Sequence, residues 1–260
     1  MARAKGGMKA HTLLNAETNM PSFVKFTAAA MHDQQFYKYI KELPDHSIIA
    51  FDKAYINYPQ FEEFTKRSIY YVTRQKENAN YVSIEEYDLP DDAPHILKDE
   101  KIEVTYLENK IEKKQQMRRV AFFSKKHGKA FVYITNNFEM AAVDIAAIYA
   151  NRWQIETFFK KLKQNFPLTY FLGDNVNAIE IQIWCALIAL LLLDVLHKGQ
   201  NATIAFSIFA TIVRLHLMNY ISVAEIIETY KCKRTRKKKK LNTSVAEKRH
   251  PPAFQMNFAF

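Results

Sequence analysis

The segment from residue 68 to residue 136 constrains the fold most, because it contains five β-rich runs in succession. The runs cover residues 68–73, 81–87, 101–106, 118–123 and 130–134, and polar or proline-containing turns separate them. β-branched and aromatic residues are frequent in these runs, as is typical of strands. The chain on either side of this segment mixes strand and helix patterns. We therefore predict an α/β protein that is interrupted by a mostly β insertion.

Ahead of the insertion, the pattern predicts a hairpin, a helix and a buried strand. Residues 8–14 and 21–27 are typical of two antiparallel strands joined by a short turn. The helix is expected over residues 33–43, with Asp33 as its N-cap. Residues 47–51 form a short, continuously apolar run, which indicates a central buried strand.

Asp52 follows that apolar run directly. In open α/β sheets the chemistry takes place at the ends of the buried strands, so Asp52 is a candidate catalytic residue. The alternative is that Asp52 caps a turn or helix, which is a common role for aspartate. A short helix is then predicted over residues 59–66, because Pro59 suits a first helical turn.

Behind the insertion, the chain is mostly helical. We predict one long helix over residues 140–166 and a strongly apolar helix over residues 178–196, followed by helices over residues 201–217 and 223–230. The longest uncharged run, residues 181–193, is too short to span a bilayer. The second helix is therefore expected to be buried within the protein.

One face of the helix predicted over residues 140–166 carries charges of both signs. At about 100° per residue, five side chains share one arc beside an apolar stripe: Tyr149, Arg152, Glu156, Lys160 and Lys163. On pattern alone this is a solvated face, on which Glu156 forms ion pairs with Arg152 and Lys160 four residues away. The spacing of these residues supports a second interpretation.

The spacing Tyr149-x2-Arg152-x3-Glu156-x6-Lys163 resembles the Tyr-Arg-Glu-Lys signature of DDE transposases of the insertion-sequence-four family. Asp52, which begins an Asp-x-x-Tyr segment that ends at Tyr55, resembles the second catalytic aspartate of that family. The resemblance implies an α/β fold, namely a ribonuclease-H-like mixed sheet with flanking helices that is interrupted by a mostly β insertion. It also implies a bacterial insertion-sequence transposase, which cleaves DNA and transfers strands by two-metal chemistry.

On this resemblance, Asp52 and Glu156 are the catalytic carboxylates and the metal ligands. The expected cofactor is Mg²⁺, with Mn²⁺ as a possible substitute, because carboxylate oxygens suit hard cations. Arg152 and Lys163 contact DNA phosphates. The expected partners are the transposon ends and target DNA, with a homodimer in the DNA complex and no membrane.

Four further residues are considered for contact with DNA. Tyr149 and Lys160 are assigned to DNA binding with the signature residues, and the alternative for Tyr149 is a packing role at the helix edge. Arg74 and Lys76 are candidates in the insertion. Solvent-exposed strand ends are the more ordinary interpretation of these last two residues.

The first catalytic aspartate of the family has no counterpart in the expected place. In the family it lies on a strand before a Lys-x-His-x-Leu-like segment, which here is Lys9 to Leu13. Eight residues precede Lys9, and none of them is acidic. We therefore expect an amino-terminally truncated transposase that is inactive unless another carboxylate is supplied. The alternatives are a non-catalytic DNA-binding remnant, which interferes with an intact transposase, and the product of a decayed reading frame.

Composition adds limits on the function and on the domains. The net charge is +10, and eight positive charges lie within residues 231–240, which favours a polyphosphate partner or else a solvated tail. Five glycines and the absence of a phosphate-binding glycine loop argue against nucleotide binding. Two distant cysteines indicate a reducing compartment, and we expect a cytoplasmic, nucleoid-associated protein. The predicted domains are residues 1–66 and 138–217 for the two parts of the core, 67–137 for the insertion, and 218–260 for a short helix with a flexible basic tail.

Overall fold

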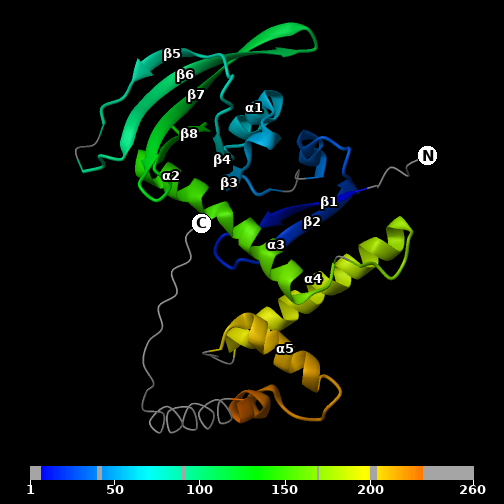
Figure 1. Cartoon of the computed structure of the whole chain (residues 1–260). Helices are drawn as coiled ribbons and strands as arrows, with labels where there is room; N and C mark the ends of the chain where they lie inside the picture. The colour runs from blue at the N-terminus through cyan, green and yellow to red at the C-terminus, as the bar shows by residue number, and fades with distance from the viewer. Residues whose placement is uncertain (1–6, 40–42, 90–91, 169, 200–203, 231–260) are drawn as a thin grey trace, which may run out of the picture. The chain divides into compact units, whose positions relative to one another are not determined.

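The computed structural model describes residues 7–39, 43–89, 92–168, 170–199 and 204–230 (Figure 1). The chain divides into two compact units, Met1–Lys160 and Lys161–Phe260. The basic run at residues 231–240 and the tail behind it lie outside the described residues, as do the first six residues.

The first unit begins with the predicted hairpin. Strand β1 (Met8–Leu14) pairs antiparallel with β2 (Pro21–Ala28) as a two-stranded sheet. The side chain of Asn15 closes the turn by accepting hydrogen bonds from the backbone N–H groups of Glu17 and Thr18, both at 2.9 Å. This is the local chemistry by which asparagine favours turns.

The helix predicted over residues 33–43 is only partly confirmed. The chain forms a tight 3₁₀ helix over Asp33–Tyr39, and residues 40–42 lie outside the described part. Phe36 and Tyr37 are adjacent in sequence, yet both side chains are buried in the same core cluster. Tyr37 also donates a hydrogen bond to the backbone oxygen of Tyr55 at 2.7 Å. The conformation of residues 33–39 is therefore set by the packing of these two neighbouring rings in the core. The helical spacing of apolar residues, on which the prediction relied, does not determine it.

A mixed six-stranded sheet forms the body of the unit, in the order β3-β4-β8-β7-β6-β5. Its strands are β3 (Ile48–Phe51), β4 (Tyr70–Arg74), β5 (Val82–Glu86), β6 (Ile96–Glu108), β7 (Ile111–Ser124) and β8 (Lys129–Thr135). Strands β3 and β4 are parallel, and the other neighbouring pairs are antiparallel. The strands predicted for the insertion thus continue the sheet that β3 begins.

The prediction that residues 47–51 form a central strand is wrong. Within the described residues, β3 lies at the edge of the sheet and pairs only with β4. Its apolar sequence has another cause, because both faces of the strand are covered. Ile49 and Phe51 belong to one core cluster, and helix α2 (Ala142–Asn151) packs against β3 as well.

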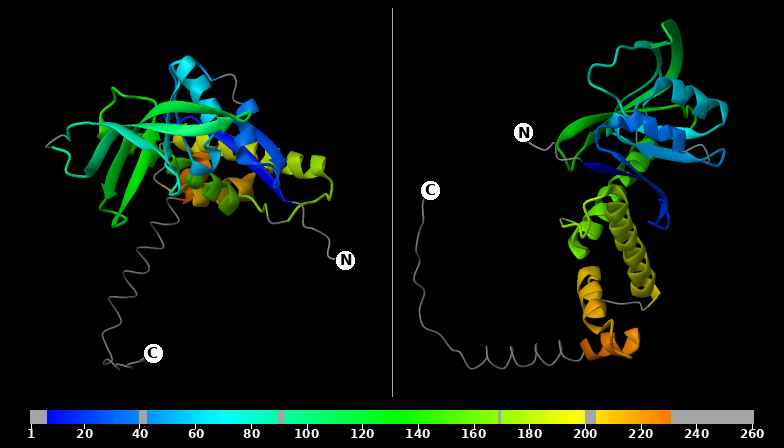
Figure 2. Two further views of the ribbon diagram at one scale, coloured as in Figure 1. Left: turned by 90° about the horizontal axis from the view of Figure 1, so that it is seen from above. Right: turned by 90° about the vertical axis from the view of Figure 1, so that its right-hand side faces the viewer.

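Strands β6 and β7 form a ribbon that is longer than the runs predicted over residues 101–106 and 118–123 (Figure 2). At its tip, Asn109 and Lys110 both have positive φ values, of 50° and 66°, as a tight hairpin turn requires. The outer part of the ribbon carries many charges, and Lys114 pairs across it with Glu103 at 2.7 Å. Such polar stretches lack the apolar alternation by which strands are predicted.

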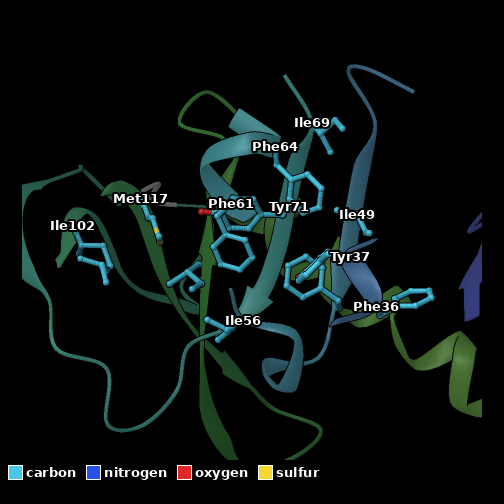
Figure 3. Close-up of a cluster of buried hydrophobic side chains, with 13 residues drawn as sticks. Phe36, Tyr37, Ile49, Ile56, Phe61, Phe64, Ile69, Tyr71, Ile102 and Met117 are labelled. Atoms are coloured by element: carbon cyan, nitrogen blue, oxygen red, sulfur yellow. The ribbon is translucent and has the colours of Figure 1, made fainter. Parts of the chain in front are cut away.

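Two cores cover the two faces of the sheet. On one face, helix α1 (Tyr58–Lys66) packs Phe61 and Phe64 against Tyr71 of β4 (Figure 3). On the other face, α2 packs against Val72 and its neighbours on β7 and β8. Tyr71 and Val72 point to opposite sides because successive strand residues alternate. A mixed sheet with helices on both faces confirms the predicted ribonuclease-H-like fold class.

The second unit is helical. Helix α4 (Val176–Gly199) and helix α5 (Phe206–His216) are followed by a helix whose described part covers residues 223–230. A core of isoleucines around Phe209 joins these last two helices. Helix α4 has 24 residues and a mean hydropathy of 2.2, so by length and composition alone it could cross a membrane; core helices of other proteins meet the same criterion. It buries Leu187 and Leu190 but leaves Ile188 and Leu192 exposed, so the prediction of a fully covered helix is wrong.

Candidate active site

The signature residues lie on two consecutive helices, and the prediction of one continuous helix over residues 140–166 is wrong. Helix α2 ends at Asn151, and α3 (Trp153–Asn165) begins after a turn at Arg152. The Arg152 N–H bonds to the Tyr149 carbonyl at 3.1 Å, which is the i to i+3 pattern of a tighter 3₁₀ turn. Tyr149 therefore belongs to α2, and Glu156 belongs to α3.

The Tyr149 ring is buried and packs on Tyr133 of β8, with 4.8 Å between the ring centroids. Burial raises the pKa of its hydroxyl, Arg152 opposes that rise, and Asp52 adds to it. The guanidinium of Arg152 lies over the same ring, 5.5 Å from its centroid. Tyr149 thus supports the arginine of the signature while its own ring is fixed by the sheet.

Arg152 occupies the junction between the helices and is largely buried, with 17% of its side chain exposed. Its Nη2 donates to the Glu156 Oε1 at 2.8 Å, and its Nε is buried without a hydrogen-bond partner among the described residues. Burial works to lower the pKa of this guanidinium. The hydrogen bond with Glu156, together with Tyr149 and Asp52, more than offsets that effect and raises the pKa.

Asp52 has the capping role that was considered from the sequence. Its Oδ1 accepts from the Ala54 N–H at 3.1 Å and caps the short 3₁₀ helix Lys53–Tyr55. At the same time, its charge acts on Arg152, as that of Glu156 does. Glu156 on α3 thus contacts Arg152 directly, whereas Asp52 at the end of β3 acts on it only through its charge.

A polar cluster beside Asp52 was not singled out in the sequence. The buried imidazole of His11 contacts the Tyr55 hydroxyl through Nδ1 and the Thr27 hydroxyl through Nε2, both at 2.9 Å. Burial raises the pKa of Tyr55 to about 12, with contributions from Asp33 and Asp52. His11 belongs to the Lys-x-His segment and Tyr55 to the Asp-x-x-Tyr segment. These two segments were the only sequence signal that could have indicated the cluster.

Lys9 completes the polar cluster by pairing with Asp33 at 3.0 Å. The same amino group donates to the backbone oxygen of Met31, also at 3.0 Å. Asp33 thus forms an ion pair with Lys9, and its charge also acts on His11 and Tyr55. Lys163 of the signature and the neighbouring Lys160 are exposed further along α3.

The donor set suits a hard cation but does not complete a two-metal site by itself. Asp52 and Glu156 offer carboxylate oxygens, which Mg²⁺ and Mn²⁺ prefer. Over the described ranges, no three histidine, cysteine, aspartate or glutamate side chains converge as a metal-binding group. Asp52 and Glu156 therefore stay predicted metal ligands, and the contact that the structure shows between the candidate residues is the pair of Arg152 and Glu156.

The sequence of this chain was compared with those of known proteins and protein families. The sequence matches the family described as the transposase DDE domain over residues 2–192. It is 28% identical to a Sinorhizobium fredii protein named transposase y4zB over 225 residues, which cover 85% of this chain and 62% of that protein. It is 25% identical to a Geobacillus stearothermophilus protein named as a transposase for insertion sequence element IS5377, over 79% of this chain and 54% of that protein.

A third relative, from Synechocystis, is named as a transposase for insertion sequence element IS4SA. It is 28% identical over 75% of this chain and 55% of its own length. The chain thus spans little more than half the length of these relatives, from 54% to 62%. The family match covers well over half of the chain and includes both Asp52 and Glu156. The chain belongs to the transposase DDE domain family.

Proposed function

We propose that this chain is the catalytic part of an insertion-sequence transposase, which cleaves DNA and transfers strands. The observation that carries the proposal is the buried Nε of Arg152, which has no hydrogen-bond partner among the described residues although the same guanidinium pairs with Glu156. A phosphate oxygen suits such a donor, because guanidinium groups bind phosphate through several N–H groups at once. Arg152 thus offers a free donor to a phosphate beside the Glu156 carboxylate.

In this proposal, the carboxylates of Asp52 and Glu156 hold Mg²⁺, for which Mn²⁺ can substitute. When bound in a two-metal site, such ions activate the attacking oxygen and stabilise the leaving oxygen. The backbone N–H of Ala54 fixes Asp52 at the end of β3. Arg152 holds Glu156 in place until DNA arrives and then binds the phosphate.

The remaining signature residues bind the DNA without reading its sequence. Lys160 and Lys163 are exposed on α3 and contact phosphates as point charges. Tyr149 keeps the Arg152 guanidinium in place through the face of its ring. Its buried ring leaves only this indirect role in DNA binding.

Cleavage in this proposal needs a third carboxylate besides Asp52 and Glu156. Two protein ligands do not hold two metal ions in the geometry that in-line displacement requires. We propose that another carboxylate of this chain, or one from a second copy of it, supplies the missing ligand, so that the purified chain contains all that cleavage needs.

A second candidate is a DNA-binding protein without catalysis, which competes with an intact transposase for DNA ends or subunits. The observation that favours it is the ion pair between Arg152 and Glu156, which engages one of the two carboxylates. Together with the lack of a three-ligand cluster among the described residues, this pairing leaves a site that binds phosphate without cutting.

The deciding experiment is nicking of supercoiled DNA by the purified chain with Mg²⁺ or Mn²⁺, beside Asp52→Asn and Glu156→Gln. Glu63→Gln is the matched control, because Glu63 is a carboxylate on α1, away from the signature residues. The catalytic proposal expects metal-dependent nicking that both site variants abolish and the control retains. Bound but uncut DNA in every metal condition would overturn it in favour of the second candidate.

A further inference from the structure

Most cations of β6 and β7 pair with carboxylates; Lys101, which lies over the Phe138 ring, is an exception among the described residues. On β6 and β7, Lys98, Lys113 and Lys114 each lie within 2.8 Å of a glutamate oxygen, and Arg118 and Arg119 also pair with carboxylates. Around β8 the situation differs. Arg74, Lys125, Lys126 and Lys129 have no carboxylate within ion-pair distance in the described part of the chain. The positive charge of these four residues is therefore available to an anionic partner.

Aromatic rings, and not carboxylates, hold two of these unpaired cations. The guanidinium of Arg74 lies 4.8 Å from the centre of the Phe131 ring, and the Lys129 ammonium lies 5.3 Å from it. Contact with a ring face orients a cation without neutralising its charge. The Phe131 ring thus positions Arg74 and Lys129, and no carboxylate of the described residues pairs with them.

A series of ring contacts connects Phe131 with the candidate active site. Phe131 stacks on Tyr133 at 6.5 Å, and Tyr133 packs on Tyr149, over which Arg152 lies. Arg74 also acts electrostatically on the hydroxyls of Tyr133 and Tyr149. The contacts are continuous from Arg152 to β8 within one unit.

The turn between β7 and β8 extends this row of charge outward. Ser124 and Lys129 pair across the strands, and the turn between them carries Lys125 and Lys126, both exposed. The turn is closed by a hydrogen bond of 2.9 Å from the Gly128 N–H to the Ser124 oxygen, with Gly128 at a φ of +61°. Its lysines are therefore presented by an ordered turn.

We propose that Arg74, Lys125, Lys126 and Lys129 form a basic track that binds the backbone of the DNA flanking the cleaved bond. The inference rests on the proposed function, since it takes DNA as the ligand of Arg152. The partner is a polyphosphate chain, because the track offers a row of cations that no carboxylate of the described residues neutralises. The phosphates would be bound without base reading, which fixes the position of the DNA relative to the site.

The test compares two triple variants that remove equal charge from the two ends of β7. The track variant is Lys125→Gln, Lys126→Gln and Lys129→Gln. The control is Lys110→Gln, Lys113→Gln and Lys114→Gln at the turn between β6 and β7, where the exposed ion pairs contribute little to stability. Both proteins keep the complete chain, and matching circular dichroism spectra and melting temperatures show that both are folded.

Affinity for a DNA duplex is measured over a range of salt concentrations. The slope of log K against log salt falls by about 0.9 for every phosphate that the protein no longer neutralises. The track variant should therefore lower the slope by about 2 to 3 and weaken binding by about tenfold or more. The control should keep the wild-type slope. Equal slopes for the track variant and wild type, or equal reductions in both variants, would overturn the track.

The Asp52→Asn variant separates this inference from the proposed function. It should abolish nicking without reducing the salt slope, because it removes no cation. A reduced slope in the track variant without nicking by wild type would support the track and contradict catalysis. Nicking that depends on Asp52 together with an unchanged slope in the track variant would support catalysis and overturn the track.

Discussion

Arg152 donates a hydrogen bond to Glu156 across one helical turn, at 2.8 Å, while its Nε remains buried without a partner in the described part of the chain. An unsatisfied buried donor costs about 1–3 kcal/mol. The surroundings of Arg152 nevertheless raise the pKa of its guanidinium, so the folded protein favours the charged side chain. Arg152 is therefore held firmly while one of its donors is left for a ligand.

The first prediction concerns Arg152→Met, which keeps the length of the side chain but removes the charge. We expect the free energy of unfolding to change by about 1 kcal/mol or less, because removal of the unsatisfied donor offsets loss of the ion pair with Glu156. DNA affinity should fall, since the phosphate donor is removed. Urea unfolding and DNA titration check both effects. A loss of stability with unchanged DNA affinity would show that Arg152 is a structural residue.

The second prediction uses two buried tyrosines of the core around α1. The Tyr71 hydroxyl is buried without a hydrogen-bond partner among the described residues, whereas the Tyr37 hydroxyl donates to the Tyr55 oxygen at 2.7 Å. Tyr71→Phe should therefore stabilise the protein by about 1 kcal/mol or leave it unchanged, and Tyr37→Phe should cost about 1 kcal/mol. Thermal unfolding of both variants decides. A larger loss for Tyr71→Phe than for Tyr37→Phe would contradict the assigned hydrogen bonds.

The sequence predicts elements well where one local rule decides. The alternation and turn chemistry around Asn15 predict the hairpin, and Pro59 marks the start of a helix that begins at Tyr58. The strand end at Asp52 was found because a continuously apolar run shows burial on both faces. Such a run does not show which neighbours a strand pairs with, and β3 is an edge strand among those described.

Other features depend on contacts between residues that are distant in sequence. Helical spacing passes through Arg152 without a break, so the junction between α2 and α3 is invisible to periodicity. Arg118 and Asp99 are 19 residues apart, and nothing in their local sequence shows that they meet. For the candidate site, the spacing that resembles the family signature proposes Glu156 and Arg152, whereas the packing of Tyr133 on Tyr149 is visible only in the fold.

The third prediction concerns the pH dependence of stability through His11. Burial lowers the pKa of His11, which Asp33 partly opposes and Lys9 reinforces. A histidine with a lowered pKa in the folded state binds fewer protons there than in the unfolded chain. Its contribution to stability is thus complete above the ordinary pKa of 6.5 and is lost as the pH falls below that value.

Unfolding of wild type and His11→Gln at pH values between about 5 and 7.5 checks this dependence. The variant should be less stable at neutral pH, because it disturbs the contacts with Tyr55 and Thr27, but its stability should change less with pH. His46→Gln, in an exposed turn, is the control and should keep the wild-type dependence. If the stability of wild type and of His11→Gln changed with pH in the same way, the lowered pKa of His11 would not be the cause of the pH dependence.

The last prediction concerns the buried ion pair between Arg118 and Asp99. Two hydrogen bonds join them, from Nε to Oδ1 at 2.9 Å and from Nη2 to Oδ2 at 2.6 Å. The remaining Nη1 donates to the backbone oxygens of Phe138 and Met140, at 3.2 and 2.5 Å. The arginine therefore ties β7 to the segment that leads into α2 and the candidate active site.

Asp99→Leu leaves the Arg118 charge buried and should cost about 3–5 kcal/mol, whereas Asp99→Leu combined with Arg118→Met should be less destabilised than that single variant. The cause is that removing both partners leaves no uncompensated charge. A double-mutant cycle by urea unfolding measures the coupling. Because the double variant still lacks the two bonds to the 138–140 segment, its DNA nicking should stay reduced although stability is partly restored. Additive losses of stability would mean that the two side chains do not form a pair.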